Sequence, residues 1–144
     1  TVSLLVHAGQ PLGESYVGRG GMFAVTPEGA GALRGLADAP FQPGEPVAEG
    51  LQGWPLLVRA PGEAAYSFED GARDRRSALA LDGAGRVLLI VAPTPAFTLR
   101  ELSDWLAAAD LDVATAANLD GGSSSGLIAR GAGEGERIDP FAPL

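Results

Sequence analysis

A short segment near the end of the sequence concentrates the side chains that are best suited to chemistry. It runs from Asn118 to Gly126 and reads Asn-Leu-Asp-Gly-Gly-Ser-Ser-Ser-Gly. Asp120 supplies a carboxylate, and Asn118 supplies an amide. Gly121 and Gly122 allow the backbone to adopt positive φ values and to approach a ligand closely. Consecutive N–H groups in such a turn can bind an anion, so the segment predicts a site for an anionic ligand.

The serines of this segment add hydroxyl donors to the candidate site. Ser123 and Ser124 follow the two glycines directly. Neither serine has an evident base beside it, so a serine nucleophile is not predicted. An alternative interpretation is a flexible Gly/Ser turn between two strands, in which Asp120 only caps the turn. Composition alone does not separate these two interpretations.

A site for an anion also needs a cation, and every positively charged side chain in this sequence is an arginine. Arg75 and Arg76 stand directly before a strand-like stretch at residues 77–81. A guanidinium group can bind phosphate through two parallel hydrogen bonds. Arg76 is therefore the predicted phosphate clamp, with Arg75 as a second cation beside it.

Three predicted elements lead into the candidate loop. Residues 87–92 form a continuous apolar run, which is typical of a central strand buried on both faces. Thr98 and Glu101 form a capping box, and apolar residues at helical spacing predict a helix over residues 99–109. Residues 113–117 form a second apolar run. The pattern predicts a βαβ unit with parallel strands in an α+β fold, with a mixed β-sheet and at least one packed helix.

This arrangement would bring the candidate residues to one edge of the sheet. Ligands bind at the carboxyl ends of strands in open α/β sheets, and Thr94 and Asp120 both follow such ends. Residues 77–81 and 87–92 form a predicted hairpin, so Arg76 would lie at the same edge. We therefore expect Arg76, Thr94 and Asp120 to cluster.

The rest of the chain carries weaker patterns. Strands are predicted at the apolar runs, whereas residues 27–50 are expected to be mostly loop, with a helical turn near residues 32–37. Residues 131–144 are expected to be irregular. The apolar runs outside the βαβ unit lie at residues 2–6, 21–25, 51–59 with a break at Trp54-Pro55, and 126–130.

Composition bounds the class of protein. A length of 144 residues fits one domain. The net charge of −8 argues against nucleic acid as a partner. With no cysteine and only His7, zinc sites built on several His or Cys ligands are excluded, and no metal or cofactor is predicted. No apolar run approaches the ~18 residues of a membrane span, so no membrane insertion is predicted.

The loop motif resembles that of a known family. Residues 118–127 are similar to the Asn-x-Asp-Gly-Gly-(Gly/Ser)-Ser motif of the phosphodiester glycosidase domain. The resemblance continues over most of the chain. Residues 75–82 and 97–102 resemble the family in order and spacing, and residues 20–25 resemble an upstream strand. Residues 51–58, which include Gln52, resemble its Gln-x-x-Pro-Leu-Leu-Val segment.

The resemblance implies hydrolysis of the C1–O bond of a sugar linked through a phosphodiester. Asp120 would act as nucleophile, base or stabiliser of positive charge, and Arg76 would clamp the phosphate. The expected partner is a phosphorylated sugar or glycan, in envelope or exopolysaccharide metabolism at an extracytoplasmic location. The expected substrate-binding residues are Asn118, Gly121, Gly122, Ser123, Ser124, Arg75, Gln52 and Thr94.

The sequence departs from the family pattern at one point. An Asn-Gly-(Gly/Ala)-Phe-Phe segment, usual near the start of the family's domain, is absent. We therefore expect residues 1–144 to form a single domain of this type that lacks its N-terminal segment and its last strand. Two alternatives remain: a non-catalytic module that binds carbohydrate or anions, and a structural domain of a larger surface protein.

Overall fold

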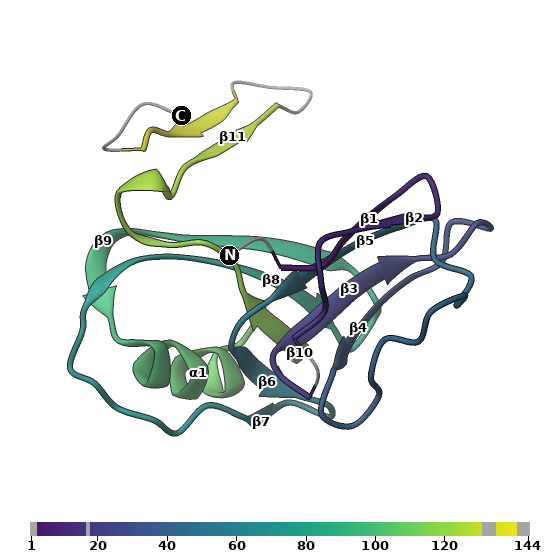
Figure 1. The fold of residues 1–144 in the computed structure, drawn as a ribbon. Coiled ribbons are helices and arrows are strands. Elements are labelled where there is room, and N and C mark those ends of the chain that lie inside the picture. The colour runs from purple at the N-terminus through teal and green to yellow at the C-terminus, as the bar shows by residue number, and fades with distance from the viewer. Residues whose placement is uncertain (1–2, 17, 131–134, 141–144) are drawn as a thin grey trace.

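The computed structural model describes residues 3–16, 18–130 and 135–140, and their strands form two five-stranded sheets and a separate hairpin (Figure 1). The first sheet has the order β2-β1-β5-β3-β4. Its strands are β1 (Leu5–His7), β2 (Gln10–Leu12), β3 (Gly21–Val25), β4 (Gly31–Gly35) and β5 (Glu49–Gly53). The second has the order β7-β6-β10-β8-β9. Its strands are β6 (Leu56–Arg59), β7 (Glu63–Ala64), β8 (Asp74–Asp82), β9 (Val87–Phe97) and β10 (Val113–Asn118).

The predicted α+β fold with a βαβ unit is wrong, because the described part of the chain is mostly β-sheet with antiparallel neighbours. β9 and β10 were expected to be the two parallel strands of that unit, but each pairs antiparallel with β8. They therefore run in the same direction with β8 between them. The physical reason is the β8–β9 hairpin, which occupies one edge of β8 and leaves the other edge for β10.

The burial predicted for residues 87–92 is also wrong. β9 is an edge strand, and Val87 and Leu89 are 49% and 60% exposed. Leu88 and Ile90 alternate with them and pack against the core beneath the helix. A continuous apolar run is thus compatible with an edge strand when only every second side chain is covered.

The single α-helix among the described residues confirms its prediction closely. α1 spans Leu99–Ala108, and both hydrogen bonds of the capping box are present. The Thr98 hydroxyl accepts from the Glu101 N–H at 3.2 Å, and the Glu101 carboxylate accepts from the Thr98 N–H at 2.9 Å. Leu102 and Leu106 are buried on the face that meets the second sheet.

The second sheet is the middle layer of the molecule. One face packs against α1 through a cluster that includes Leu57, Ala80 and Leu106. The other face meets the first sheet where Leu79 and Ala117 pack against Leu33 of β4. A separate hydrophobic cluster around Met22 packs against the first sheet. β10 therefore has covered side chains on both faces and carries the chain through the core to the candidate loop.

Several boundaries differ from those predicted. Residues 27–50 contain strand β4, which pairs with β3, in place of the expected helical turn. Residues 51–59 are interrupted at Trp54-Pro55 as predicted, but β5 and β6 lie in different sheets. β12 (Glu136–Ile138) falls in the region expected to be irregular and pairs with β11 (Leu127–Ala129). Residues 1–2, 131–134 and 141–144 lie outside the described residues, so those parts of the predictions are not addressed.

Candidate functional site

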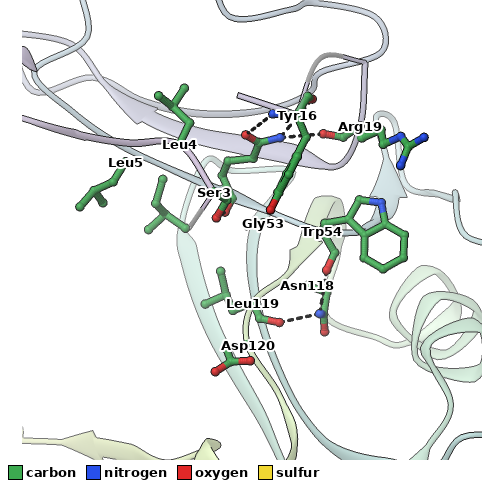
Figure 2. Close-up of a pocket in the computed structure, with 12 residues that line it drawn as sticks. Ser3, Leu4, Leu5, Tyr16, Arg19, Gly53, Trp54, Asn118, Leu119 and Asp120 are labelled. Atoms are coloured by element: carbon green, nitrogen blue, oxygen red, sulfur yellow. Dashed lines mark hydrogen bonds between the residues drawn. The ribbon is translucent and has the colours of Figure 1, made fainter. Parts of the chain in front are cut away.

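A pocket of about 780 Å³ opens where β5 of the first sheet and β10 of the second sheet end side by side. Figure 2 shows residues from four segments around it: the N-terminal strand, the loop before β3, the end of β5 and the end of β10. The lining residues are Ser3, Leu4, Leu5, Tyr16, Arg19, Leu51, Gln52, Gly53, Trp54, Asn118, Leu119 and Asp120. The pocket thus includes the start of the predicted loop.

The two strand ends meet through their backbones. A Cβ atom on Gly53 would lie 2.2 Å from the carbonyl oxygen of Asn118, so only glycine fits at the end of β5. The side-chain Nδ2 of Asn118 donates to the carbonyl oxygen of Trp54 at 2.9 Å, and the Asn118 N–H donates to that of Pro55 at 2.9 Å. These contacts fix the Trp54 turn against the start of the candidate loop.

Asn118 combines a structural bond with an acceptor oxygen that has no partner among the described residues. Its side chain is 7% exposed, yet the residue lines the pocket. Its Oδ1 accepts no hydrogen bond from any residue that the structure describes. Buried polar atoms are nearly always paired, so this oxygen, which has almost no exposed surface of its own, is an exception beside the pocket.

Asp120 lines the pocket and also holds its own turn. Its Oδ1 accepts from the Gly121 N–H at 2.9 Å, and its Oδ2 accepts from the Ser124 hydroxyl at 2.9 Å. The residue is exposed. The turn-capping role considered from the sequence is therefore present, and the same two bonds orient the carboxylate at the pocket.

The glycines confirm the expectation of at least one positive φ in the loop. Gly122 has φ 73°, whereas Gly121 is extended with φ −140°. A Cβ on Gly121 would lie 3.0 Å from the Arg75 carbonyl oxygen, so the loop runs tightly along β8. Gly122 begins the 3₁₀ turn η1 (Gly122–Ser124). Gly121, Gly122, Ser123 and Ser124 do not line the pocket itself.

The two predicted arginines lie beside the loop but do not line the pocket. Arg76 donates through Nε to the Phe97 carbonyl oxygen at 3.3 Å and through Nη2 to that of Ala72 at 2.6 Å. Arg75 is only 2% exposed and donates through Nη2 to the Asp139 carbonyl oxygen at 2.9 Å. Both guanidinium groups are therefore engaged with backbone carbonyl groups.

Thr94 does not join the expected cluster. It lies in β9 between the paired positions Ala92 and Phe97, where the single residue Arg75 faces residues 93–96. This irregularity carries Thr94 outward, and its side chain is exposed and absent from the pocket lining. The structure brings the Asp120 loop and Arg76 together, because Gly121 packs against both arginines, but it leaves Thr94 apart.

Gln52, which the resemblance implied as a substrate-binding residue, is in the pocket lining, but its amide is turned to the protein. It is 4% exposed. Its Oε1 accepts from the Tyr16 N–H at 3.1 Å. Its Nε2 donates to the carbonyl oxygens of Tyr16 at 3.2 Å and Arg19 at 3.0 Å. Gln52 therefore holds the loop before β3 against the end of β5.

Sequence reasoning missed the residues that this loop and the Trp54 turn bring to the pocket. Trp54 is 49% exposed, and its ring meets that of Tyr66 edge-on with centroids 5.9 Å apart. Burial raises the pKa of Tyr66 behind it, and the nearby Asp70 carboxylate adds to this effect. The sequence could have indicated Trp54, because it stands two positions after Gln52 within the segment that resembles the family. Tyr16 and Arg19 carried no motif that linked them to the site.

The described residues provide neither a candidate metal site nor a membrane-spanning helix. His, Asp and Glu side chains form no group of three or more that would suit a metal ion within those residues. His7 instead bonds the Glu49 carboxylate at 3.0 Å on the surface. No helix in the part of the chain that the structure describes is long and apolar enough to cross a membrane.

Comparisons with known proteins agree with the loop motif. The family model for phosphodiester glycosidase matches residues 4–142. The fold is similar to the zebrafish N-acetylglucosamine-1-phosphodiester alpha-N-acetylglucosaminidase catalytic domain auto-inhibited by its pro-peptide, with a TM-score of 0.62 and 20% identity. The alignment covers 86% of this chain and 47% of that one, so the chain spans about half the length of that structure. A search of curated proteins finds no match. The family match extends over nearly the whole sequence, and the chain belongs to the phosphodiester glycosidase family.

Proposed function

We propose that this protein hydrolyses the bond between C1 of a sugar and the oxygen of a phosphodiester, in envelope or exopolysaccharide metabolism outside the cytoplasm. Family membership supports the reaction class. The observation that carries the proposal is the position of Asp120, which lines a pocket of about 780 Å³ and whose carboxylate is held by Gly121 and Ser124.

The chemistry suits a site with a single carboxylate in the pocket. Ordinary glycosidases use two carboxyl groups, because a sugar alkoxide leaves poorly unless it is protonated. A phosphomonoester leaves as a stable anion and needs no proton. Water adds to C1, the C1–O bond breaks with its electron pair on the phosphate oxygen, and the water proton passes to the solvent. Asp120 faces the positive charge that develops at C1.

Two neighbours of Asp120 complete the proposed sugar site. Asn118 forms part of the pocket wall and holds the Trp54 turn through its Nδ2. The exposed ring of Trp54, held by Asn118 through its carbonyl group, offers an apolar face to the sugar. Aromatic rings with one wet face commonly combine apolar contact and polar recognition in this way.

The test is Asp120→Asn in the full-length protein, with an aryl phosphodiester of N-acetylglucosamine 1-phosphate as substrate. We expect kcat to fall by about a hundredfold or more, since removal of one preorganised electrostatic group typically costs that much. Ser124→Ala is the companion variant: it keeps the carboxylate but removes one of the two bonds that orient it, so kcat should fall by a smaller factor than in Asp120→Asn.

The alternative function is a module that binds the same ligands without turning them over. The turn bonds of Asp120 favour it to the extent that the carboxylate serves only the turn. Near-full kcat in Asp120→Asn would show that the carboxylate is a turn residue. A wild-type protein that binds the sugar phosphodiester but never releases product would establish the binding module instead.

A further inference from the structure

We infer that Arg19 and Tyr16, held in place by Gln52, form the subsite that recognises the phosphate group of the substrate. This inference rests on the proposed function for the class of ligand. It differs from the expectation drawn from the sequence, which gave the phosphate to Arg75 and Arg76. The geometry favours Arg19 because it lines the pocket together with Asp120, whereas Arg75 and Arg76 do not.

Arg19 is an uncommitted cation in an acidic protein. Six of the ten arginines form ion pairs with carboxylates, and Arg75 and Arg76 bond to backbone carbonyl groups. Among the described residues, only Arg19 and Arg130 show neither kind of side-chain bond, and only Arg19 lines the pocket. The paired arginines are Arg34, Arg59, Arg73, Arg86, Arg100 and Arg137.

The net charge of −8 makes this cation significant. An anionic substrate is repelled by the protein as a whole and by Asp120 within the pocket. A guanidinium group offers five N–H donors in a planar fork that matches phosphate oxygens. Arg19 is therefore the group in the pocket lining that can offset this repulsion directly.

Tyr16 places a second donor in the same part of the pocket. Figure 2 shows its ring extending from the loop before β3 into the space above Gly53. No hydrogen bond of its hydroxyl to another described residue is present, and the residue is only partly exposed. A phenol hydroxyl can donate to a phosphate oxygen without adding charge.

Gln52 is the positioning residue of this subsite. Its amide makes three hydrogen bonds, all to the backbones of Tyr16 and Arg19. The loop ends at Gly20, where a Cβ would lie 2.1 Å from the Gly53 carbonyl oxygen, so the loop is pressed directly onto the end of β5. A nearly buried amide fully committed to one loop fixes the backbone from which the side chains of Tyr16 and Arg19 extend.

The experiment measures binding of two probes to the full-length protein in an Asp120→Asn background, which prevents turnover. The probes are N-acetylglucosamine 1-phosphate and the uncharged methyl N-acetylglucosaminide. We expect Arg19→Gln to weaken binding of the phosphorylated probe by about tenfold or more, as charge-assisted hydrogen bonds suggest. Binding of the uncharged probe should stay the same. Arg130→Gln is the matched control and should change neither.

Further variants separate the parts of the subsite. Tyr16→Phe should weaken binding of the phosphorylated probe by a smaller factor, about threefold to tenfold. Gln52→Ala should weaken binding of the phosphorylated probe about as much as Arg19→Gln does. The double variant with both changes should bind little worse than Arg19→Gln alone, because the two changes remove the same interaction with the phosphate. Gln10→Ala, at an exposed position in β2, is the control for Gln52→Ala.

The outcomes distinguish this inference from the proposed function. If Arg19→Gln binds the phosphorylated probe as tightly as its parent, or if Arg130→Gln weakens it equally, the subsite is wrong even where the wild type turns over substrate. If the wild type lacks turnover but Arg19→Gln selectively loses the phosphorylated probe, the subsite stands and the hydrolase proposal fails. A fall in melting temperature with unchanged probe binding in Gln52→Ala would make Gln52 a structural residue only.

Discussion

The Nδ2 atom of Asn118 donates a hydrogen bond to the carbonyl oxygen of Trp54 at 2.9 Å, across 64 positions of sequence. This bond joins the last residue of β10 to the turn between the two sheets. Trp54 follows β5 of the first sheet and precedes β6 of the second. Beside the pocket, this side chain therefore adds to the backbone contacts that fix the point where the chain passes between the sheets.

The first prediction concerns that bond. Asn118→Ala removes the donor and leaves the Trp54 carbonyl oxygen unpaired near the core. We expect a loss of about 1 to 3 kcal/mol in unfolding free energy, measured by urea denaturation, together with lower kcat/KM. Asn118→Asp keeps the shape but replaces the donor by an acceptor, so it should be at least as damaging. Equal stability of Asn118→Ala and wild type would contradict this role.

The second prediction concerns the positive φ of Gly122. Gly122→Ala places a Cβ in the left-handed region, which costs about 1 to 2 kcal/mol for an L-residue. Gly85, with φ 79° and open space around it, is the matched control in the turn between β8 and β9. We expect both alanine variants to lose similar stability, while only Gly122→Ala lowers kcat/KM. Equal activities in the two variants would show that the shape of the loop does not matter for catalysis.

The third prediction concerns Ser103, which links α1 to the second sheet. It is fully buried, donates to the Leu57 carbonyl oxygen at 2.5 Å and accepts from the N–H groups of Ala65 and Tyr66 at 3.2 Å each. Ser103→Ala should lower the unfolding free energy by about 1 to 3 kcal/mol and leave KM unchanged. Ser67→Ala, at an exposed position in the following loop, should change neither. A stable Ser103→Ala protein would show that other bonds hold this junction.

The fourth prediction concerns acid stability. The Thr98 N–H, and after it the Arg73 guanidinium, lowers the pKa of Glu101 below its ordinary value of 4.5. A carboxyl group with a lowered folded pKa contributes stability above its unfolded pKa, and that contribution is lost as the pH falls through the folded value. Glu101→Gln should therefore melt at a lower temperature than wild type at pH 7.

The difference in melting temperature between Glu101→Gln and wild type should shrink as the pH falls below 4.5 and vanish in stronger acid. Asp104→Asn is the control on the same helix, since its 3.8 Å contact with Arg100 is exposed at both ends. The melting temperature of Asp104→Asn should differ only slightly from that of wild type at any pH. A Glu101→Gln difference that persists unchanged into acid would mean that the charge of Glu101 contributes nothing.

The sequence by itself determined the features that depend on neighbouring residues. The capping box at Thr98 and Glu101 and the apolar stripe behind it were sufficient to predict α1 to within one residue. The hairpin of β8 and β9 followed from two apolar runs around Asp82-Gly83-Ala84-Gly85. The loop motif after Asn118 led to the family, because the types and order of its residues are specific in themselves.

The tertiary structure alone decided how the strands pair and which cations reach the pocket. A strand–helix–strand pattern does not say whether another strand lies between its two strands, and here the hairpin partner β8 occupies that place. Likewise, Arg75 and Arg76 precede a strand in sequence, but their guanidinium groups bind backbone carbonyl groups outside the pocket. Arg19 reaches the pocket because Gln52 binds its loop from 33 positions away. Such contacts between distant segments arise from packing of the two sheets, which no local pattern records.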